Sequence, residues 1–174
     1  MAVLVKPASE ADLDAIVELN GFVQRLHADL HPDDFKQTAD ADGVLAFFVA
    51  RLSAIAVAEL KSAVVGYVWY ETQSLPETSF SPAKSRLYVH HLSVAPSARR
   101  QGVAAALMRH VEQLARAHGL SEIALGAWAA NKVALRFFAA QGFVQTTATL
   151  RKRLLAPQSL AGKSGRSRSR RPKV

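Results

Sequence analysis

The 174-residue sequence contains no cysteine, which excludes disulfides, thiolate metal ligands and cysteine nucleophiles. It also lacks any apolar run near the ~20 residues that are needed to span a bilayer, so we expect no membrane insertion. The first seven residues are too short for a signal peptide and carry no basic leader. These absences favour a cytoplasmic protein.

Acidic residues are missing from residues 156–174, where six of the basic residues gather. They are Lys163, Arg166, Arg168, Arg170, Arg171 and Lys173. The formal net charge is +8, and removing these six leaves only +2 for residues 1–155. We therefore expect one folded domain over residues 1–155 and a basic tail over 156–174 that is disordered alone. Such a tail could bind nucleic acid, an acidic surface or a partner subunit, although a solvated tail without a function is the favoured interpretation.

Hydrophobic periodicity predicts strands at residues 3–6, 55–60, 63–70, 86–94 and 122–128, and one or two more within 143–154. It predicts helices at residues 9–20, 22–30, 42–52, 101–118 and 131–141, and a loop at 73–84. Antiparallel strands come first and a strand–helix–strand crossover follows. This order predicts an α/β (α+β mixed) fold, with one mixed sheet that is flanked by helices on both faces.

A candidate phosphate-binding turn lies between the strand that ends at Val94 and the helix that begins near Gln101. A helix N-terminus carries unpaired N–H groups and a partial positive charge, so it attracts phosphate. Gly102 would let a phosphate approach the backbone, and Arg99 and Arg100 would add charge. Alone, the pattern is a weak signal that also fits an ordinary turn with exposed arginines.

Two motifs together resemble the GNAT superfamily of N-acetyltransferases. The first is LSVAP at residues 92–96 followed by RRQGVAAAL at 99–107, and the second is NKVALRFFAAQGF at 131–143. They match the family's strand, V-x-P link and [RQ]-x-x-G-x-[GA] turn, and its N-x-x-A-x-x-F-Y-x-x-x-G-F segment. The resemblance covers about residues 3–154 and implies a sheet that splays apart at its centre.

The resemblance also implies a site for acetyl-CoA. The strand that ends at Val94 and the strand around 123–128 would start side by side and splay apart, with acetyl-CoA in the wedge. Main-chain groups of Leu92 and Val94 would bind the pantetheine arm, and Asn131 would contact the cofactor from the opposite wall. The pyrophosphate would be held by main-chain N–H groups of Arg99, Arg100, Gln101, Gly102, Val103 and Ala104.

The sequence departs from the family pattern at two positions. Ala104 replaces a commoner glycine. Phe138 stands where many members have a tyrosine that can protonate the leaving thiolate, and phenylalanine cannot donate a proton. Phe138 would still pack against the cofactor, so the acid role falls to water, another side chain or bulk solvent, or is not needed.

His90 and His91 are the candidates for a catalytic base or substrate ligand, because relatives often carry carboxylates on this strand just before the acetyl-binding stretch. An imidazole has an ordinary pKa of ~6.5, which suits proton transfer near neutral pH. Adjacent strand residues face opposite sides of a sheet, so we expect only one of the two to face the substrate. The alternative is that one or both are packing histidines.

His27 and His31 have the i, i+4 spacing of helical metal ligands. Pro32 ends that helix and no third ligand is obvious, so we predict no metal site. Residues 26–35 lie where the family's first helices border the acceptor site, which would give them a role in substrate selection, although a simple surface helix is the favoured interpretation. Trp128 is expected on the strand that walls the cofactor.

The expected activity is direct transfer of an acetyl group from acetyl-CoA to a primary amine, with a small molecule favoured over a protein as acceptor. Two alternatives are a CoA-binding regulator without catalysis, suggested by Phe138, and an acetyltransferase that associates with protein or nucleic acid through its tail. Family analogy also allows a homodimer.

Overall fold

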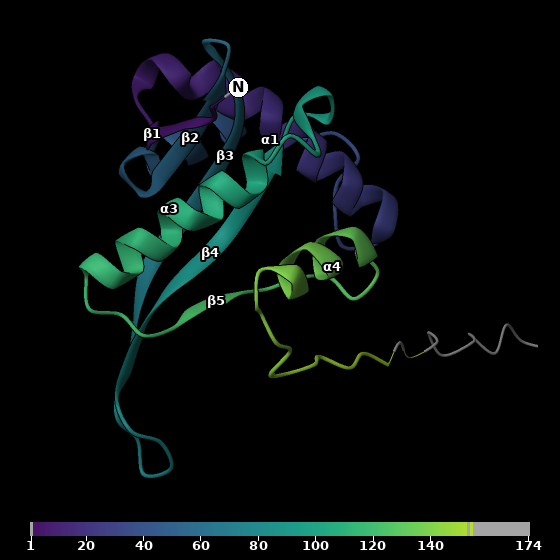
Figure 1. The fold of residues 1–174 in the computed structure, drawn as a ribbon. Helices are drawn as coiled ribbons and strands as arrows, with labels where there is room; N and C mark the ends of the chain where they lie inside the picture. Colours follow the sequence, from purple (N-terminus) through teal and green to yellow (C-terminus); the bar gives the residue numbers. More distant parts are fainter. Residues whose placement is uncertain (1, 153, 155–174) are drawn as a thin grey trace, which may run out of the picture. The chain divides into compact units, whose positions relative to one another are not determined.

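The computed structural model describes residues 2–152 and 154, and the chain divides into two compact units at residues 1–143 and 144–174. The first unit contains a five-stranded sheet in the order β1-β2-β3-β4-β5 (Figure 1). Its strands are β1 (Leu4–Pro7), β2 (Ile55–Leu60), β3 (Ala63–Leu75), β4 (Lys84–Val94) and β5 (Ile123–Leu125). Neighbouring strands are antiparallel except β4 and β5, which run parallel. The predicted mixed sheet is therefore confirmed.

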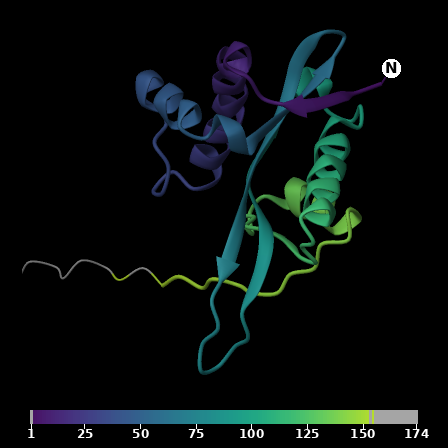
Figure 2. The same ribbon diagram turned by 90° about the vertical axis from the view of Figure 1, so that its left-hand side faces the viewer.

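Helices cover both faces of this sheet, as the sequence predicted. They are α1 (Leu13–Leu30), α2 (Ala41–Val49), α3 (Val103–Ala117) and α4 (Lys132–Ala140), and short 3₁₀ turns lie at Glu10–Asp12, Leu52–Ala54 and Pro96–Ala98. In Figure 2 the purple and blue helices lie on one side of the strands and the green α3 on the other. One buried core joins α1 and α2 to the sheet through Ile16, Leu19 and Phe48. The other core joins α3 to the opposite face through Leu107 and Val111.

The start of the first helical segment is held by Ser9 and Asp12. The Ser9 backbone N–H and hydroxyl both donate to Asp12 Oδ2, at 2.8 and 2.7 Å. This capping contact is what the serine and the acid three residues later predicted. The two predicted helices at 9–20 and 22–30 are wrong in number, because α1 continues unbroken through Gly21 as one helix of 18 residues. A single mid-helix glycine weakens a helix without ending it.

Of the two hairpins of the sheet, the first has the predicted turn and the second is longer than predicted. Lys61 and Ser62 have φ of 52° and 63°, which forms the tight turn predicted between β2 and β3. The second hairpin is longer than expected, since pairing continues to Leu75 and Lys84. The loop is therefore 76–83 and not 73–84.

Two other predictions fail toward the C-terminus. The last strand of the sheet stops at Leu125, just before Gly126, so Trp128 lies outside it. No strand is found in residues 144–152 and 154, where Val144 and Leu150 are 80% and 93% exposed and so bury too little apolar surface to stabilise one. Residue 153 and residues 155–174, with the basic tail, lie outside the described part of the chain. No helix among the described residues is long and apolar enough to cross a membrane.

Gly66 allows α3 to lie close to the centre of the sheet. A Cβ atom at this position would lie 2.9 Å from the Ser93 carbonyl oxygen and 3.1 Å from Val103 Cγ1. Backbone cannot yield as a flexible side chain can, so only glycine fits here. Because Val103 is the first residue of α3, this contact fixes where the helix begins relative to β4.

Replacing Gly66 with alanine should therefore destabilise the protein by about 1–3 kcal/mol, the usual range for overpacking. Gly21→Ala is the matched control. Its Cβ would meet only the far end of the Arg25 side chain, at 3.3 Å, and alanine stabilises a helix interior by about 0.5–1 kcal/mol relative to glycine. Urea denaturation of the two variants would measure both effects, and equal stabilities would contradict the assigned close approach.

Candidate functional site

Strand β5 has only three residues, and it pairs with the first half of the longer β4. The register joins Leu87 to Ile123 and Val89 to Leu125, after which β5 ends while β4 continues to Val94. Figure 1 shows the two strands side by side at one end and apart at the other. Over residues 90–94, the edge of β4 that faces β5 has no strand partner among the described residues. This is the splayed arrangement that the family resemblance implied.

A β-bulge at His90 changes the direction of the β4 backbone groups. The register with β3 shifts here, because His91 lies opposite Trp69 while Val89 lies opposite Tyr70. The Leu87 N–H donates to Glu122 O on the β5 side, and the Ala95 N–H donates to Val65 O on the β3 side. Residues 87 and 95 are eight apart, so in a regular strand both would point the same way. The extra residue reverses the alternation.

The reversal gives Leu92 and Val94 a distinct orientation. The backbone N–H and C=O groups of successive strand residues point to alternate sides. Since those of Ala95 point to β3, those of Leu92 and Val94 point to the open edge. Their side chains pack into the core under α3. This is the orientation that main-chain binding of an extended ligand requires. Contact with the cofactor itself stays a prediction for both residues.

The bulge also places the two neighbouring histidines on one face, contrary to the prediction that they point to opposite sides. The His90 ring stacks on Trp69, with centroids 4.1 Å apart and planes inclined by 16°. The His91 ring meets the same indole edge-on at 5.1 Å. The simple alternation fails because the two residues on the bulged strand oppose one residue on its partner. Both histidines therefore face the side that carries α1 and α2.

His91 belongs to a buried hydrogen-bond chain. Its Nδ1 lies 3.2 Å from the Tyr67 hydroxyl, which donates to Asn20 Oδ1 at 3.3 Å. Since that hydroxyl has one proton, His91 Nδ1–H must donate to Tyr67, which leaves the lone pair on Nε2. Burial, with repulsion from His27 and His90, lowers the pKa of His91 to about 4. His91 is therefore neutral at physiological pH.

His90 has a carboxylate partner. Its Nε2 lies 3.1 Å from Glu71 Oε2, and the two side chains are 24% and 46% exposed. A carboxylate only accepts, so Nε2–H donates, and in the neutral form of the ring the lone pair lies on Nδ1. This carboxylate–imidazole arrangement fixes both the tautomer and the ring orientation, as a general base requires.

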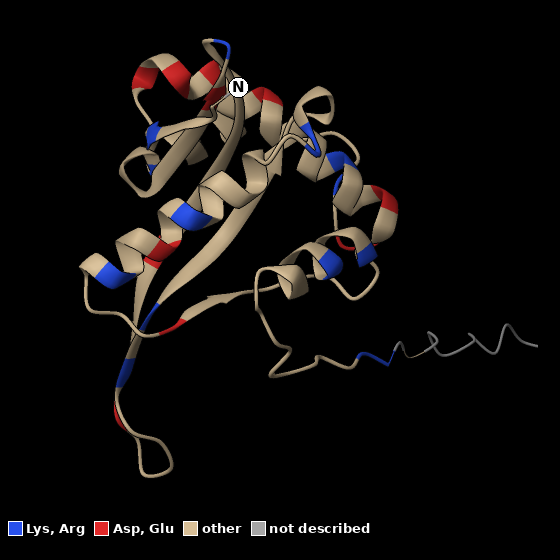
Figure 3. Cartoon of the chain, in the orientation of Figure 1, with Lys and Arg blue, Asp and Glu red and all other residues tan. Residues whose placement is uncertain are grey.

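The turn before α3 has the backbone of an anion-binding loop. Arg100 and Gly102 have φ of 62° and 80°, and the first helical bond runs from the Ala106 N–H to Gly102 O. N–H groups earlier in the helix have no helical acceptor. A Cβ atom at residue 102 would have nothing within 4 Å, so the backbone there is open. In Figure 3 a short stretch of this loop is blue, the colour of Lys and Arg.

The predicted residues of the turn have different surroundings. Val103 is buried and anchors the helix, while Ala104 is half-buried. Gln101 Nε2 donates to Ser97 O at 2.9 Å, so its side chain braces the loop. The long contact of 3.5 Å from Arg99 Nε to Val94 O ties the turn to the end of β4. The structure thus brings the turn and the open strand edge together.

Asn131 and Phe138 lie on α4. Asn131 is the N-cap of that helix, because its Oδ1 accepts from the Ala134 N–H at 3.1 Å. The Phe138 ring packs between Phe137 and Phe143, at centroid distances of 5.3 and 5.7 Å. Local structure alone accounts for Asn131 Oδ1, so the predicted cofactor contacts of both residues stay predictions.

An aromatic cluster joins the end of α1 to the segment after β5. The His31 ring lies 4.2 Å from Trp128, Phe35 contacts Trp128 at 5.6 Å, and His27 lies 4.8 Å from Phe35. The two histidines of the i, i+4 pair thus contact rings, and no group of three metal-ligating side chains occurs among the described residues. Burial and repulsion from His31 lower the pKa of His27. Sequence reasoning missed this cluster, since no spacing signals it.

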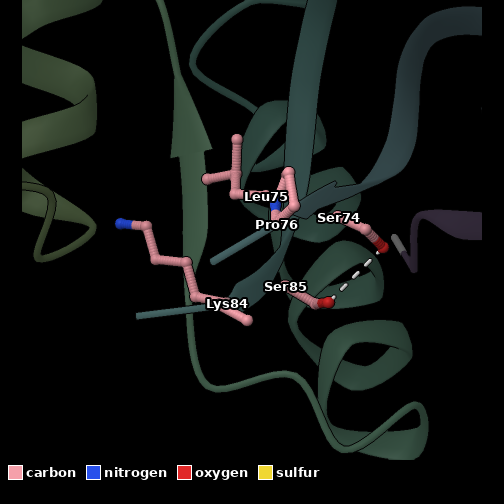
Figure 4. Close-up of a pocket in the computed structure, with 6 residues that line it drawn as sticks. Ser74, Leu75, Pro76, Lys84 and Ser85 are labelled. Carbon is pink, nitrogen blue, oxygen red and sulfur yellow. Dashed lines mark hydrogen bonds between the residues drawn. The ribbon is translucent and has the colours of Figure 1, made fainter. Parts of the chain in front are cut away.

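A surface hollow at the far end of the long hairpin is not part of this site. Figure 4 shows it lined by Ser74, Leu75, Pro76, Lys84 and Ser85, with a long contact of 3.5 Å between the two serine hydroxyls. The strand register places it at the opposite end of β3 and β4 from Gly66 and Val94. None of the residues that line it was predicted to bind the cofactor or to act in catalysis.

The acetyltransferase (GNAT) family matches residues 20–143, which is more than half of the chain. Human N-acetyltransferase 8 is 35% identical over 106 residues, which is 61% of this chain and 45% of that protein. The mouse probable N-acetyltransferase family 8 member 5 is 36% identical over 90 residues, or 52% and 38%. This chain thus aligns with less than half of the length of either relative.

Solved structures share the fold at low sequence identity. A tetramutant of the BH1408 protein from Bacillus halodurans superposes with a TM-score of 0.80 at 18% identity, over 87% of this chain and 99% of that one. The aminoglycoside N-acetyltransferase AAC(6')-Iy in complex with CoA gives a TM-score of 0.67 at 18% identity, over 89% and 96%. The fold is therefore shared with a protein whose structure contains CoA.

The lowered pKa of His91 predicts a loss of stability in acid. Its folded pKa of about 4 lies below the ordinary 6.5, so the unfolded chain binds a proton between these values while the folded chain does not. Stability falls as the pH drops through this window, by about 3 kcal/mol from this residue at ~1.36 kcal/mol per unit.

A His91→Gln variant removes the contribution of this imidazole to the loss of stability in acid. We expect its free energy of unfolding, measured by urea denaturation, to fall less than that of the wild type between pH 7 and pH 4. Parallel pH profiles for the two proteins would contradict the assigned burial of a neutral imidazole.

Proposed function

We propose that this chain, which belongs to the acetyltransferase (GNAT) family, transfers an acetyl group from acetyl-CoA to a primary amine. One observation carries the proposal. The unpaired edge of β4 leads directly to an open, glycine-containing helix N-terminus, so backbone donors line one continuous path. An extended pantetheine arm ending in a pyrophosphate has the shape and charge to follow it.

The residues of this path fit acetyl-CoA. Main-chain groups of Leu92 and Val94 would bind the pantetheine arm as a neighbouring strand does, and they would polarise the acetyl carbonyl. N–H groups from Arg99 to Ala104 would hold the pyrophosphate, with the two arginine side chains adding charge. When bound, acetyl-CoA supplies the activated acetyl group.

A base is useful because the acceptor is protonated in solution. An alkyl amine has a pKa near ~10.4, so forming the neutral amine at pH 7 costs about 4–5 kcal/mol. His90 is the better candidate of the two histidines, since Glu71 orients it and its Nδ1 carries the lone pair. His91 is a poor proton acceptor near neutral pH because its pKa is about 4. We assign it to positioning, through Tyr67 and Asn20.

The acceptor is proposed to be a small-molecule amine. AAC(6')-Iy, which shares the fold, has been crystallised with a bisubstrate analogue of CoA and monomethyl-acetylneamine. The cluster of His31, Phe35 and Trp128 would then border the acceptor, at the place where the family's first helices do so. A second candidate is CoA binding without catalysis, which Phe138 favours because it lacks a hydroxyl. Homodimerisation and a role of the basic tail in nucleic-acid binding stay predictions.

Gly102→Glu should abolish acetyl-CoA binding, measured by calorimetry, because it places bulk and negative charge at the pyrophosphate position. Gly119→Glu is a matched control at the other end of α3. Both glycines have positive φ, 80° and 68°, and open space at Cβ, so the backbone strain and charge change are alike. Retention of binding in Gly102→Glu, or its loss in both folded variants, would contradict the assigned turn.

The two histidines should differ in their kinetic effect. We expect His90→Gln to lower kcat/KM about 10²-fold and to remove the acidic limb of the pH–rate profile, since a protonated base cannot accept a proton. His91→Gln should keep that limb. Thiol release from acetyl-CoA with a panel of amines and aminoglycosides would measure both. An unchanged profile in His90→Gln would exclude it as the base.

A further inference from the structure

The proposed reaction releases a thiolate, and the position that often supplies its proton is Phe138. That side chain has no hydroxyl, and its ring is packed against Phe137 and Phe143. Another tyrosine could supply the missing hydroxyl, and the sequence has three tyrosines, at positions 67, 70 and 88. Their surroundings differ enough to separate them.

Tyr67 and Tyr70 are committed elsewhere. Tyr67 is completely buried, and its hydroxyl is shared between Asn20 and His91. Burial raises its pKa strongly, so it holds its proton. The half-buried Tyr70 belongs to the core on the α3 face, with its ring 6.5 Å from that of His110. The Tyr67 hydroxyl is thus already hydrogen-bonded, and Tyr70 lies on the opposite face of the sheet from the two histidines.

Tyr88 lies in the short paired part of β4 and β5, one residue before the last pair of the ladder. It pairs with Ala124 in the short parallel ladder, and its hydroxyl oxygen lies 3.1 Å from the place that a Cβ atom at residue 126 would take. Residue 126 is glycine and follows the last residue of β5. The side chain therefore leans along the sheet from the paired region toward the point where the strands part.

Two further contacts describe the Tyr88 ring. Its edge-on contact with His90, at 4.8 Å between centroids, places it on the same face as the candidate base. The Arg86 guanidinium lies 5.3 Å from the ring centroid, and Glu122 pairs with that guanidinium at 3.5 Å. The hydroxyl itself has no hydrogen-bond partner among the residues described. A tyrosine with its ring fixed and its hydroxyl unpaired is ready to donate to a ligand.

We propose that Tyr88 is the proton donor for the leaving thiolate, replacing the hydroxyl that Phe138 lacks. This inference rests on the acetyl transfer proposed above. The amine nitrogen forms the new C–N bond as the thioester C–S bond breaks, and the sulfur leaves with the electron pair. The Tyr88 hydroxyl gives its proton to that sulfur, His90 accepts the proton from the amine, and solvent restores both groups.

The test compares Tyr88→Phe with the matched control Tyr70→Phe, in the full chain, with hydroxylamine as the acceptor. Hydroxylamine is uncharged near neutral pH and needs little help from a base, so it isolates the step at sulfur. We expect Tyr88→Phe to bind acetyl-CoA with the wild-type Kd while kcat for thiol release falls about 10²-fold. We also expect it to lose the decline of kcat at alkaline pH, where a tyrosine gives up its proton. Tyr70→Phe should keep the wild-type kcat and profile.

Three results would overturn this inference and leave the proposed acetyl transfer standing. A wild-type kcat and pH profile in Tyr88→Phe would exclude proton donation. A fall in kcat together with an equal loss of affinity for acetyl-CoA would assign Tyr88 to binding. An equal fall in kcat in Tyr70→Phe would show that the effect is not specific to the Tyr88 hydroxyl. If the wild type neither binds acetyl-CoA nor accelerates thiol release, the proposed acetyl transfer has failed, and this inference fails with it.

Discussion

The extra residue at His90 in β4 is the constraint on which the geometry of the site depends. Without it, residues 92 and 94 would direct their N–H groups into the sheet and not toward the open edge. The same residue brings His90 and His91 to one face, where both contact Trp69. One irregularity therefore sets the direction of the backbone donors and the position of the candidate base.

The rest of the domain holds this irregular strand in place from both sides. Gly66 lets α3 approach the end of β4, and the buried Ser93 hydroxyl donates to Leu19 O on α1 at 2.8 Å. The chain from His91 through Tyr67 to Asn20 adds a second tie to α1. A neutral imidazole suits this buried position, because a charged one would need a compensating partner.

Much of the fold could be predicted from local patterns. The open turn at Gly102, the tight turn at Lys61 and Ser62 and the capping by Ser9 each depend on residues within a few positions, so their sequences indicate them. The bulge could not be predicted, since it depends on the register between two strands about twenty residues apart. The contact of His31 with Trp128 joins residues almost a hundred positions apart, and no local spacing indicates such a contact. Residues 144–152 contain β-forming side chains, but a strand also requires burial.

The open edge of β4 has a consequence for the protein without a ligand. An unpaired strand edge displays backbone donors and acceptors that another chain can pair with, and such edges promote self-association. A bound pantetheine arm would occupy that edge and act as a temporary neighbouring strand. Ligand would then stabilise the folded protein by mass action and would also shield the edge. The donor substrate would thereby protect the protein against aggregation, and the ligand-free protein would aggregate most readily.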